Sequence, residues 1–346
     1  MREAFIDKHL AVTIRDTEIP VPEAGQVLIR VVVSGSNPKD WKMALSWPPD
    51  GALFNQGDDI AGYIEAVGDG VLGFHKGDKV AAFHQVMKPH GSWAEYAIAP
   101  SVSTFHIPEK TSFEEASTIP LAAMTAAVGM FQRSNLPLPW NPTSEPLPYV
   151  IYGGATAVGA FAIKFAQLSN IHPLIVVAGR GSAFVETLID RKKGDTIIDY
   201  RQDDDIIREK IKAAAGGRPI HHAVDAVSEK DSWLNIGPVM TAPGQLTLMM
   251  PGIDYQPEGI SVTHAVVGYI HFPPSSGKTI EDAEFAAAFY QLMGRGLAQG
   301  WFSGHPYEVR PGGLAGLQGA MLDLQAGKAS AVKYVVRIGE TDGVEQ

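Results

Sequence analysis

The segment from Tyr149 to Gly159 carries the strongest pattern for binding chemistry in this chain. Its apolar start, Tyr149-Val150-Ile151-Tyr152, leads directly into the small residues Gly153-Gly154-Ala155-Thr156-Ala157-Val158-Gly159. A buried strand that passes through small residues into a helix start offers free backbone N–H groups and the positive end of a helix dipole to a pyrophosphate. We therefore predict a dinucleotide site at this turn. Ala157 stands where many such turns have glycine, so a tight turn without a ligand is the alternative reading.

The end of the next predicted strand, Leu174 to Ala178, bears on which dinucleotide fits. An NAD site usually has an acidic residue there, which accepts hydrogen bonds from the ribose hydroxyls. Here the chain continues with Gly179-Arg180-Gly181-Ser182 and has no acid. Because a guanidinium and a hydroxyl can bind a 2′-phosphate, Arg180 and Ser182 favour NADPH over NADH. Tyr200 could line the same pocket; the alternatives are an ordinary solvated arginine and a tyrosine at the edge of the core.

The composition argues against several classes of function. The chain has 346 residues, no cysteine and a formal net charge of −10. Nucleic-acid binding depends on Lys and Arg that displace counterions from phosphates, so this charge argues against a nucleic-acid partner. The absence of cysteine excludes disulfides, thiolate nucleophiles and cysteine-based zinc sites. No apolar stretch approaches the roughly 20 residues that span a bilayer, and Glu3 interrupts any apolar secretory segment, so we expect a cytoplasmic protein without membrane contact.

The strand and helix patterns predict an α/β fold with two domains. Residues 21–36 and 57–83 read as strands separated by Pro/Gly and Gly-Asp turns, which is typical of a small β-rich domain. A continuous helix is expected from Phe113 to Phe131, followed by a proline-rich loop over 136–148.

Later segments alternate between strands and helices, as a doubly wound parallel sheet requires. A helix is expected from Ala160 to Ser169. A helix over 314–326 and a strand over 332–338 are expected to rejoin the first domain. The expected strands of the parallel sheet are 149–152, 174–178, 196–200, 222–227 and 245–250.

Four segments together resemble the medium-chain dehydrogenase/reductase superfamily: 57–68, 77–80, 91–96 and the turn at Gly153. The resemblance covers nearly the whole chain. It implies a GroES-like β-rich catalytic domain and a Rossmann doubly wound parallel sheet that binds NADPH. The implied domains are residues 1–120 with 300–346 for the catalytic domain and residues 121–299 for the cofactor domain.

Alcohol dehydrogenases of this superfamily hold zinc through cysteine and histidine. This chain has no cysteine, and His84, His90 and His106 follow no zinc spacing, so we expect no metal. Without a Lewis acid, the remaining chemistry of the superfamily is hydride transfer to a carbon–carbon double bond that is already electron-poor, as in quinone and enoyl reductases.

A narrower resemblance rests on 36–42, 136–139, 152–157, 311–314 and 327–337. These segments are similar to the trans-acting enoyl reductases that serve fungal highly reducing polyketide synthases, the lovastatin-pathway type among them. In that family the lysine of an Asn-Pro-x-Asp-x-Lys motif lies beside the nicotinamide, and Lys42 matches it. An ammonium there would stabilise the negative charge that hydride addition places on a thioester oxygen. A solvated surface lysine is the alternative for Lys42.

The same resemblance implies further site residues. The positions implied for the cofactor are Lys39, Asp40, Lys42, Thr125, Ala155, Thr156, Ala157, Val158, Arg180, Gly181, Ser182, Ala183, Tyr200, Leu248, Met249, Ala329 and Ser330. Those implied for an acyl chain are Ala126, Met130, Arg133, Ala265, Val266, Val267, Gly268 and Tyr269. The acyl-chain segments are apolar and would equally suit core packing. No Tyr or His stands out as the proton donor to the α-carbon.

The leading hypothesis is a trans-acting enoyl reductase that uses NADPH on α,β-unsaturated polyketide thioesters. Its partner would be the acyl carrier domain of a polyketide synthase or of a polyketide synthase–peptide synthetase hybrid, and we expect a monomer. The first alternative is a stand-alone quinone or alkenal reductase of the same fold. The second is a catalytically silent NADPH-binding protein.

Overall fold

The computed structural model describes residues 1–46, 53–272 and 280–344. It divides the chain into two compact units, Met1–Leu121 with Gly268–Gln346, and Ala122–Val267. The predicted boundary at residue 299 differs from this division. The reason is helix α7 (Ile280–Gln299), which packs on strand β7 of the first unit. Within that contact, the Tyr290 hydroxyl donates to Pro120 O at 3.0 Å and the Tyr290 ring stacks on Phe105 with centroids 5.5 Å apart.

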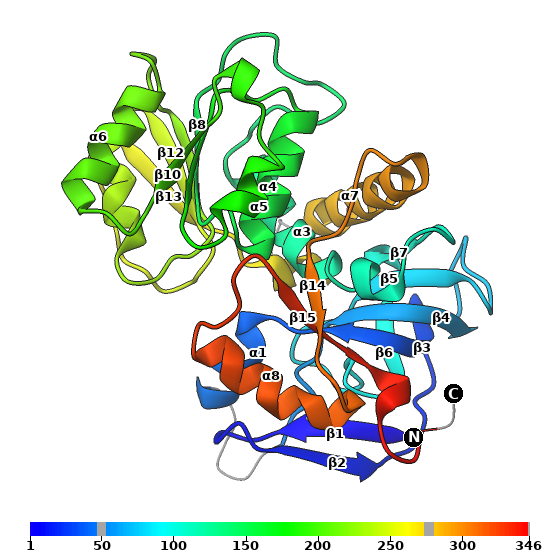
Figure 1. Ribbon diagram of the computed structural model, residues 1–346. Coiled ribbons are helices and arrows are strands. Elements are labelled where there is room, and N and C mark those ends of the chain that lie inside the picture. Colours follow the sequence, from blue (N-terminus) through cyan, green and yellow to red (C-terminus); the bar gives the residue numbers. More distant parts are fainter. Residues whose placement is uncertain (47–52, 273–279, 345–346) are drawn as a thin grey trace. The chain divides into compact units, whose positions relative to one another are not determined.

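The first unit is rich in β-structure (Figure 1). A seven-stranded sheet has the order β14-β15-β3-β4-β5-β7, with β6 also paired to β3. A separate antiparallel pair is formed by β1 and β2. The strands are β1 (Arg2–Ile6), β2 (Val12–Asp16), β3 (Gln26–Gly35), β4 (Asp59–Val67), β5 (Lys79–Phe83), β6 (Tyr96–Pro100), β7 (Thr104–His106), β14 (Tyr307–Val309) and β15 (Lys333–Arg337).

Strand β15, which was expected to rejoin the first domain, pairs antiparallel with β3. Helices α1 (Pro38–Ser46) and α8 (Gly316–Gln325) pack on each other, and the core beneath them includes Leu317, Ala320 and Met321. Among the described residues, none of the helices combines the length and the apolar character needed to span a bilayer.

The second unit contains a six-stranded parallel sheet with the order β10-β9-β8-β11-β12-β13 (Figure 1). This order is that of a doubly wound Rossmann sheet, with its switch point between β8 and β11. The strands are β8 (Tyr149–Tyr152), β9 (Leu174–Ala178), β10 (Thr196–Asp199), β11 (His222–Asp225), β12 (Gly244–Leu248) and β13 (Ile260–His264). Helices α4 (Ala157–Leu168), α5 (Ser182–Glu186) and α6 (Asp204–Ala214) belong to this unit.

The predicted helix from Phe113 to Phe131 is not continuous. It consists of α2 (Phe113–Ala116), α3 (Pro120–Ala127) and a wider turn of π-helix, Val128–Arg133. Proline lacks an N–H group and is favoured in the first turn of a helix, so Pro120 starts a new helix instead of extending α2. Helix α4 also begins at Ala157, three residues before its predicted start at Ala160.

A buried ion pair joins distant segments of the first unit. Lys333 on β15 is only 4% exposed, and its Nζ donates to Asp59 Oδ2 and, at 2.9 Å, to Asn37 Oδ1. Asp59, the first residue of β4, also accepts from Asn37 Nδ2 at 2.7 Å and from Leu121 N at 2.7 Å. A buried charge is tolerated only when it is paired and hydrogen-bonded, so Asp59 fixes β15 and the start of α1 around one point.

We predict that Lys333→Met lowers the free energy of unfolding by about 3–5 kcal/mol, because it leaves the Asp59 carboxylate buried without a cation. Urea unfolding measures this loss. The control is Lys328→Met, which removes a lysine whose side chain is 65% exposed and pairs with Asp323. The control should change stability by about 1 kcal/mol or less. Equal effects in the two variants would contradict the prediction.

Candidate functional site

The turn at the carboxyl end of β8 has the geometry of an anion site. Thr156 caps helix α4, and its Oγ1 accepts from Gly159 N at 3.0 Å. The N–H groups of Ala157 and Val158 find no acceptor within the described part of the chain. Free amides at a helix N-terminus attract a phosphate through hydrogen bonds and the helix dipole.

The glycines of this turn leave no room for larger side chains. A Cβ at Gly154 would lie 2.1 Å from Val176 Cγ1, and a Cβ at Gly159 would lie 2.3 Å from Gly153 O. Gly153 has φ +86°, a conformation that residues with side chains rarely adopt. Packing within the protein therefore requires these glycines, and the fit to the pyrophosphate of a dinucleotide rests on the free amides of Ala157 and Val158.

The residues predicted to contact a 2′-phosphate lie together at the end of β9. The Tyr200 ring covers Gly179, since a Cβ at Gly179 would lie 2.3 Å from Tyr200 Cε1. Arg180 is exposed, and Ser182 donates through its Oγ to Gly179 O at 2.5 Å. Ala183 follows Ser182 within the short helix α5. The structure thus brings Arg180, Ser182 and Tyr200 into one region, although the Ser182 hydroxyl already has an acceptor.

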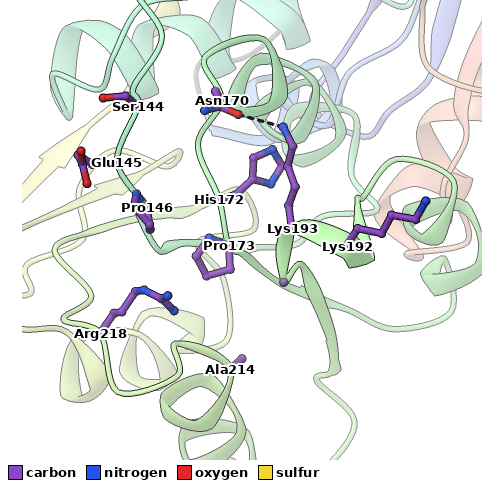
Figure 2. A pocket seen from close by; sticks show the side chains of 11 residues that line it. Ser144, Glu145, Pro146, Asn170, His172, Pro173, Lys192, Lys193, Ala214 and Arg218 are labelled. Carbon is purple, nitrogen blue, oxygen red and sulfur yellow. Dashed lines mark hydrogen bonds between the residues drawn. The ribbon is translucent and has the colours of Figure 1, made fainter.

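A cavity of about 470 Å³ lies elsewhere in the second unit (Figure 2). Its lining comes from the segments that precede β8, β9 and β10, including Pro146, His172 and Gly194. In Figure 2 the Lys193 Nζ donates to Asn170 Oδ1, at 2.9 Å. Ligands of doubly wound sheets bind outside the carboxyl ends of the strands. This cavity is at the amino ends, so it is separate from the dinucleotide turn.

In the first unit, a compact ion cluster surrounds Lys39 on α1. The Lys39 Nζ lies 2.6 Å from Asp58 Oδ2, 3.0 Å from Asp40 Oδ1 and 2.6 Å from Gln56 O. Asp40 and Asp58 are buried, with side chains 0% and 2% exposed. Lys39 and Asp40, both predicted to bind the cofactor, therefore form an ion pair with each other. Their contact with a cofactor remains a prediction.

The cluster shifts the pKa of each of its members. Burial alone would lower the pKa of Lys39, but the carboxylates of Asp40 and Asp58 outweigh it and raise that pKa. Burial raises the pKa of Asp40 to about 6, against the lowering effect of Lys39. Burial also acts to raise the pKa of Asp58, but Lys39 and His84 together lower it below its ordinary value.

Two imidazoles lie near this cluster. His84 Nδ1 is 2.9 Å from Asp58 Oδ1 and His84 Nε2 is 3.0 Å from Pro89 O, so both ring nitrogens face acceptors. His271 packs on Phe83 with ring centroids 4.8 Å apart, and its ring nitrogens have no partner among the described residues. Burial lowers the pKa of His271 to about 3, which keeps the ring neutral. His84 was named above only as a possible zinc ligand, and no pattern in the sequence indicated His271.

The other two histidines named above, His106 and His90, differ in their surroundings. His106 Nε2 is 3.1 Å from Asp78 Oδ2, and His90 has a left-handed backbone with φ 69°. Within the described residues, no group of three or more His, Asp or Glu side chains is arranged to hold a metal ion.

Lys42 lies one turn after Lys39 on α1 and is half-buried, with its Nζ 5.7 Å from the centre of the Trp41 ring. Ala329 packs against the same core as Trp41, and Ser330 follows it. These three predicted residues thus belong to the first unit. Their contact with a cofactor remains a prediction.

In the second unit, two of the predicted substrate segments meet. A Cβ at Gly129 would lie 2.7 Å from Met249 Cε and 3.5 Å from Ala265 Cβ. Ala126 and Met130 are fully buried and Ala265 is 4% exposed, which favours core packing for these three.

The other predicted residues differ in their exposure. Thr125 is 6% exposed and Leu248 is 0% exposed. Of the remaining predicted substrate residues, Arg133, Val266, Val267 and Gly268 are half-buried, and Tyr269 is 47% exposed.

Comparison with known proteins identifies the family. The model of the alcohol dehydrogenase GroES-like domain matches residues 23–109. The trans-enoyl reductase fsr4 of Gibberella fujikuroi is 42% identical over 322 residues, which cover 91% of this chain and 92% of that protein. The chain belongs to the trans-enoyl reductases of the medium-chain dehydrogenase/reductase superfamily.

Solved structures share the fold of this chain. The CurK enoyl reductase superposes with a TM-score of 0.76 at 20% identity, covering 97% of this chain and 98% of its own. A mycobacterial protein in complex with NADPH superposes with a TM-score of 0.72 at 20% identity, covering 97% of this chain and 99% of its own. This trans-enoyl reductase therefore has a GroES-like and a Rossmann domain, and its family makes it an oxidoreductase.

The sequence missed the ion cluster of this reductase. The pattern of residues 57–59, Gly-Asp-Asp, indicated a hairpin turn, because Gly-Asp pairs are common in such turns. The apolar stretch that follows could have indicated the cluster, because it marks a buried strand. Two carboxylates at the start of a buried strand need cations from elsewhere in the chain.

We predict that Lys39→Met destabilises the protein most at about pH 8 and progressively less toward about pH 5. The wild-type Asp58 pKa is lowered, so its contribution is present above the ordinary carboxyl pKa and is lost as pH falls. Without Lys39, the pKa values of Asp40 and Asp58 rise, and protonation at lower pH removes the cost of their buried charge.

Urea unfolding across this pH range measures the difference from wild type. Lys76→Met serves as the control, because its side chain is 71% exposed and pairs with Glu65 on the surface. If the loss in free energy of unfolding caused by Lys39→Met does not change with pH, the protonation of Asp40 and Asp58 does not depend on Lys39.

Proposed function

We propose that this chain is an NADPH-dependent enoyl reductase that acts in trans on α,β-unsaturated polyketide thioesters. The observation that carries the proposal is the similarity to fsr4 along 91% of the chain. The absence of cysteine supports it, because the cysteine and histidine zinc centres of alcohol dehydrogenases cannot form and the substrate double bond must already be polarised.

Bound NADPH would supply the hydride that adds to the β-carbon of the thioester, and the α-carbon would then take a proton from water. The turn at Gly153 would hold the pyrophosphate through the amides of Ala157 and Val158. Arg180 would bind the 2′-phosphate, joined by Ser182 once its hydroxyl turns away from Gly179 O. Lys42 provides an ammonium that stabilises the negative charge on the thioester oxygen. The half-buried position of Lys42 on α1 limits its solvation, and a less solvated charge interacts more strongly.

The partner that we propose is the acyl carrier domain of a polyketide synthase, or of a polyketide synthase–peptide synthetase hybrid. It presents the thioester to a monomeric reductase in the cytoplasm. The name trans-enoyl reductase, carried by fsr4 and by resD of Aspergillus sclerotiorum, supports a substrate that is delivered by a separate protein.

Reduction of a crotonyl-pantetheine thioester with NADPH tests the activity. We expect turnover by the wild type and a loss of about a hundredfold in kcat for Lys42→Ala, because one stabilising charge is removed from the transition state. Circular dichroism confirms that the variant is folded, and Lys76→Ala is the surface control. An inert wild type, or turnover of free quinones far above that of any thioester, would contradict the proposal.

Cofactor choice is tested separately through Arg180→Ala. We expect the KM for NADPH to rise about tenfold while the KM for NADH stays the same, because only NADPH carries the phosphate that the guanidinium binds. Steady-state kinetics with each cofactor measures both constants. A parallel rise in the two KM values would mean that Arg180 does not select the 2′-phosphate.

A further inference from the structure

The carboxylate of Asp225, at the end of β11, is buried and fully engaged by the loop that follows it. Its side chain is 0% exposed. Asp225 Oδ1 accepts from Val227 N at 3.0 Å and from Ser228 N at 2.8 Å, and Oδ2 accepts from the Ser232 hydroxyl. An anion without a paired cation is stabilised by several hydrogen bonds to its charged form, so the loop is shaped around this carboxylate.

The loop is held in an unusual backbone conformation. Ser228, Lys230 and Asp231 have φ values of 50°, 51° and 57°, and none of them is glycine. Left-handed backbone at such residues costs about 1–3 kcal/mol each and persists only where surrounding contacts impose it. The contacts of Asp225 lie on both sides of this stretch, at Ser228 N and at the Ser232 hydroxyl.

Two further contacts connect this loop to the predicted dinucleotide site. Val227 lies over the glycine turn, since a Cβ at Gly153 would lie 2.5 Å from Val227 Cγ2. Ser228 Oγ donates to Asp225 O at 2.8 Å and accepts from Met249 N at 2.9 Å. Strands β8 and β11 are the two neighbours at the switch point of the sheet, where dinucleotides bind.

We propose that Asp225 is a positioning residue for the NADPH site. It holds Val227 against Gly153 and, through Ser228, fixes the backbone at Met249, so that the loops after β8, β11 and β12 keep one arrangement. This role rests on the proposed function only in taking NADPH as the ligand. Asp225 itself acts through these loops, because its own oxygens are occupied.

The test is Asp225→Asn, which keeps the shape but replaces one carboxylate oxygen by a donor that faces other donors. We expect the Kd for NADPH, measured by titration calorimetry without substrate, to rise about tenfold, as the loss of one good hydrogen bond would give. The KM for NADPH should rise in parallel, with kcat within about twofold of wild type. Ser228→Ala, a milder change, should raise the Kd in the same direction.

The matched control is Asp195→Asn. Asp195 lies just before β10, at the amino ends of the strands of the same sheet, whereas Asp225 lies at their carboxyl ends. Asp195 is 2% exposed and accepts from His172 Nδ1 at 2.7 Å, Leu174 N at 2.8 Å and Asp190 N at 2.9 Å. Its loss should lower the melting temperature but leave the Kd for NADPH unchanged. If both Asp variants weaken binding equally, or if Ser228→Ala and a folded Asp225→Asn bind NADPH as wild type does, Asp225 has no positioning role.

The outcomes also separate this inference from the proposed function. A wild type that does not bind NADPH would overturn both. A wild type that binds NADPH but reduces no thioester would overturn the proposed reaction only, because the comparison of Kd values needs no substrate. Should Asp225→Asn fail to fold, Ser228→Ala decides the outcome: a Kd within about twofold of wild type would then overturn the positioning role.

Discussion

Asp58 and Asp59 are adjacent in the sequence and both buried, and each is neutralised by a different lysine. Lys39 pairs with Asp58 and comes from the first turn of α1, whereas Lys333 pairs with Asp59 and comes from β15 near the C-terminus. Both pairs must form together, because either carboxylate without its cation would be a buried charge. The orientation of α1, and with it the position of Lys42, therefore depends on these two pairs.

The second unit, Ala122–Val267, is stabilised differently. Its parallel sheet is held by apolar strands, and at their carboxyl ends Asp225 shapes the loop after β11 while free amides remain after the neighbouring β8. A helix N-terminus attracts anions, so the same edge that accommodates a buried carboxylate also fits a pyrophosphate.

The sequence predicted the parallel sheet best. Strands β8 and β9 were predicted at their observed bounds, because both are short apolar runs between turn residues and are buried throughout. The helix predicted over 113–131 was wrong in its continuity, since the pattern of apolar residues did not reveal that Pro120 starts a new helix. Strand β13, with mixed burial, gave no periodic signal and was missed.

For the site, the sequence predicted only those features that are formed by residues close together along the chain. The turn at Gly153 and the residues Arg180 and Ser182 were found because strand, turn and helix follow one another along the chain. The buried ion pair was not predictable in this way, because Lys333 meets Asp59 from 274 residues away. The left-handed loop at Ser228 was also missed, since serine gives no sign of a positive φ and the cause lies in the buried Asp225 carboxylate.

The central claim is that this chain delivers a hydride to an already polarised double bond without help from a metal. The most direct measurement uses chelator-treated protein, a crotonyl thioester and NADPH labelled with deuterium at the transferable position of the nicotinamide. We predict a saturated product with the deuterium at its β-carbon, formed at the same rate before and after chelation. Turnover that requires added zinc, or a product without deuterium at that carbon, would contradict the account.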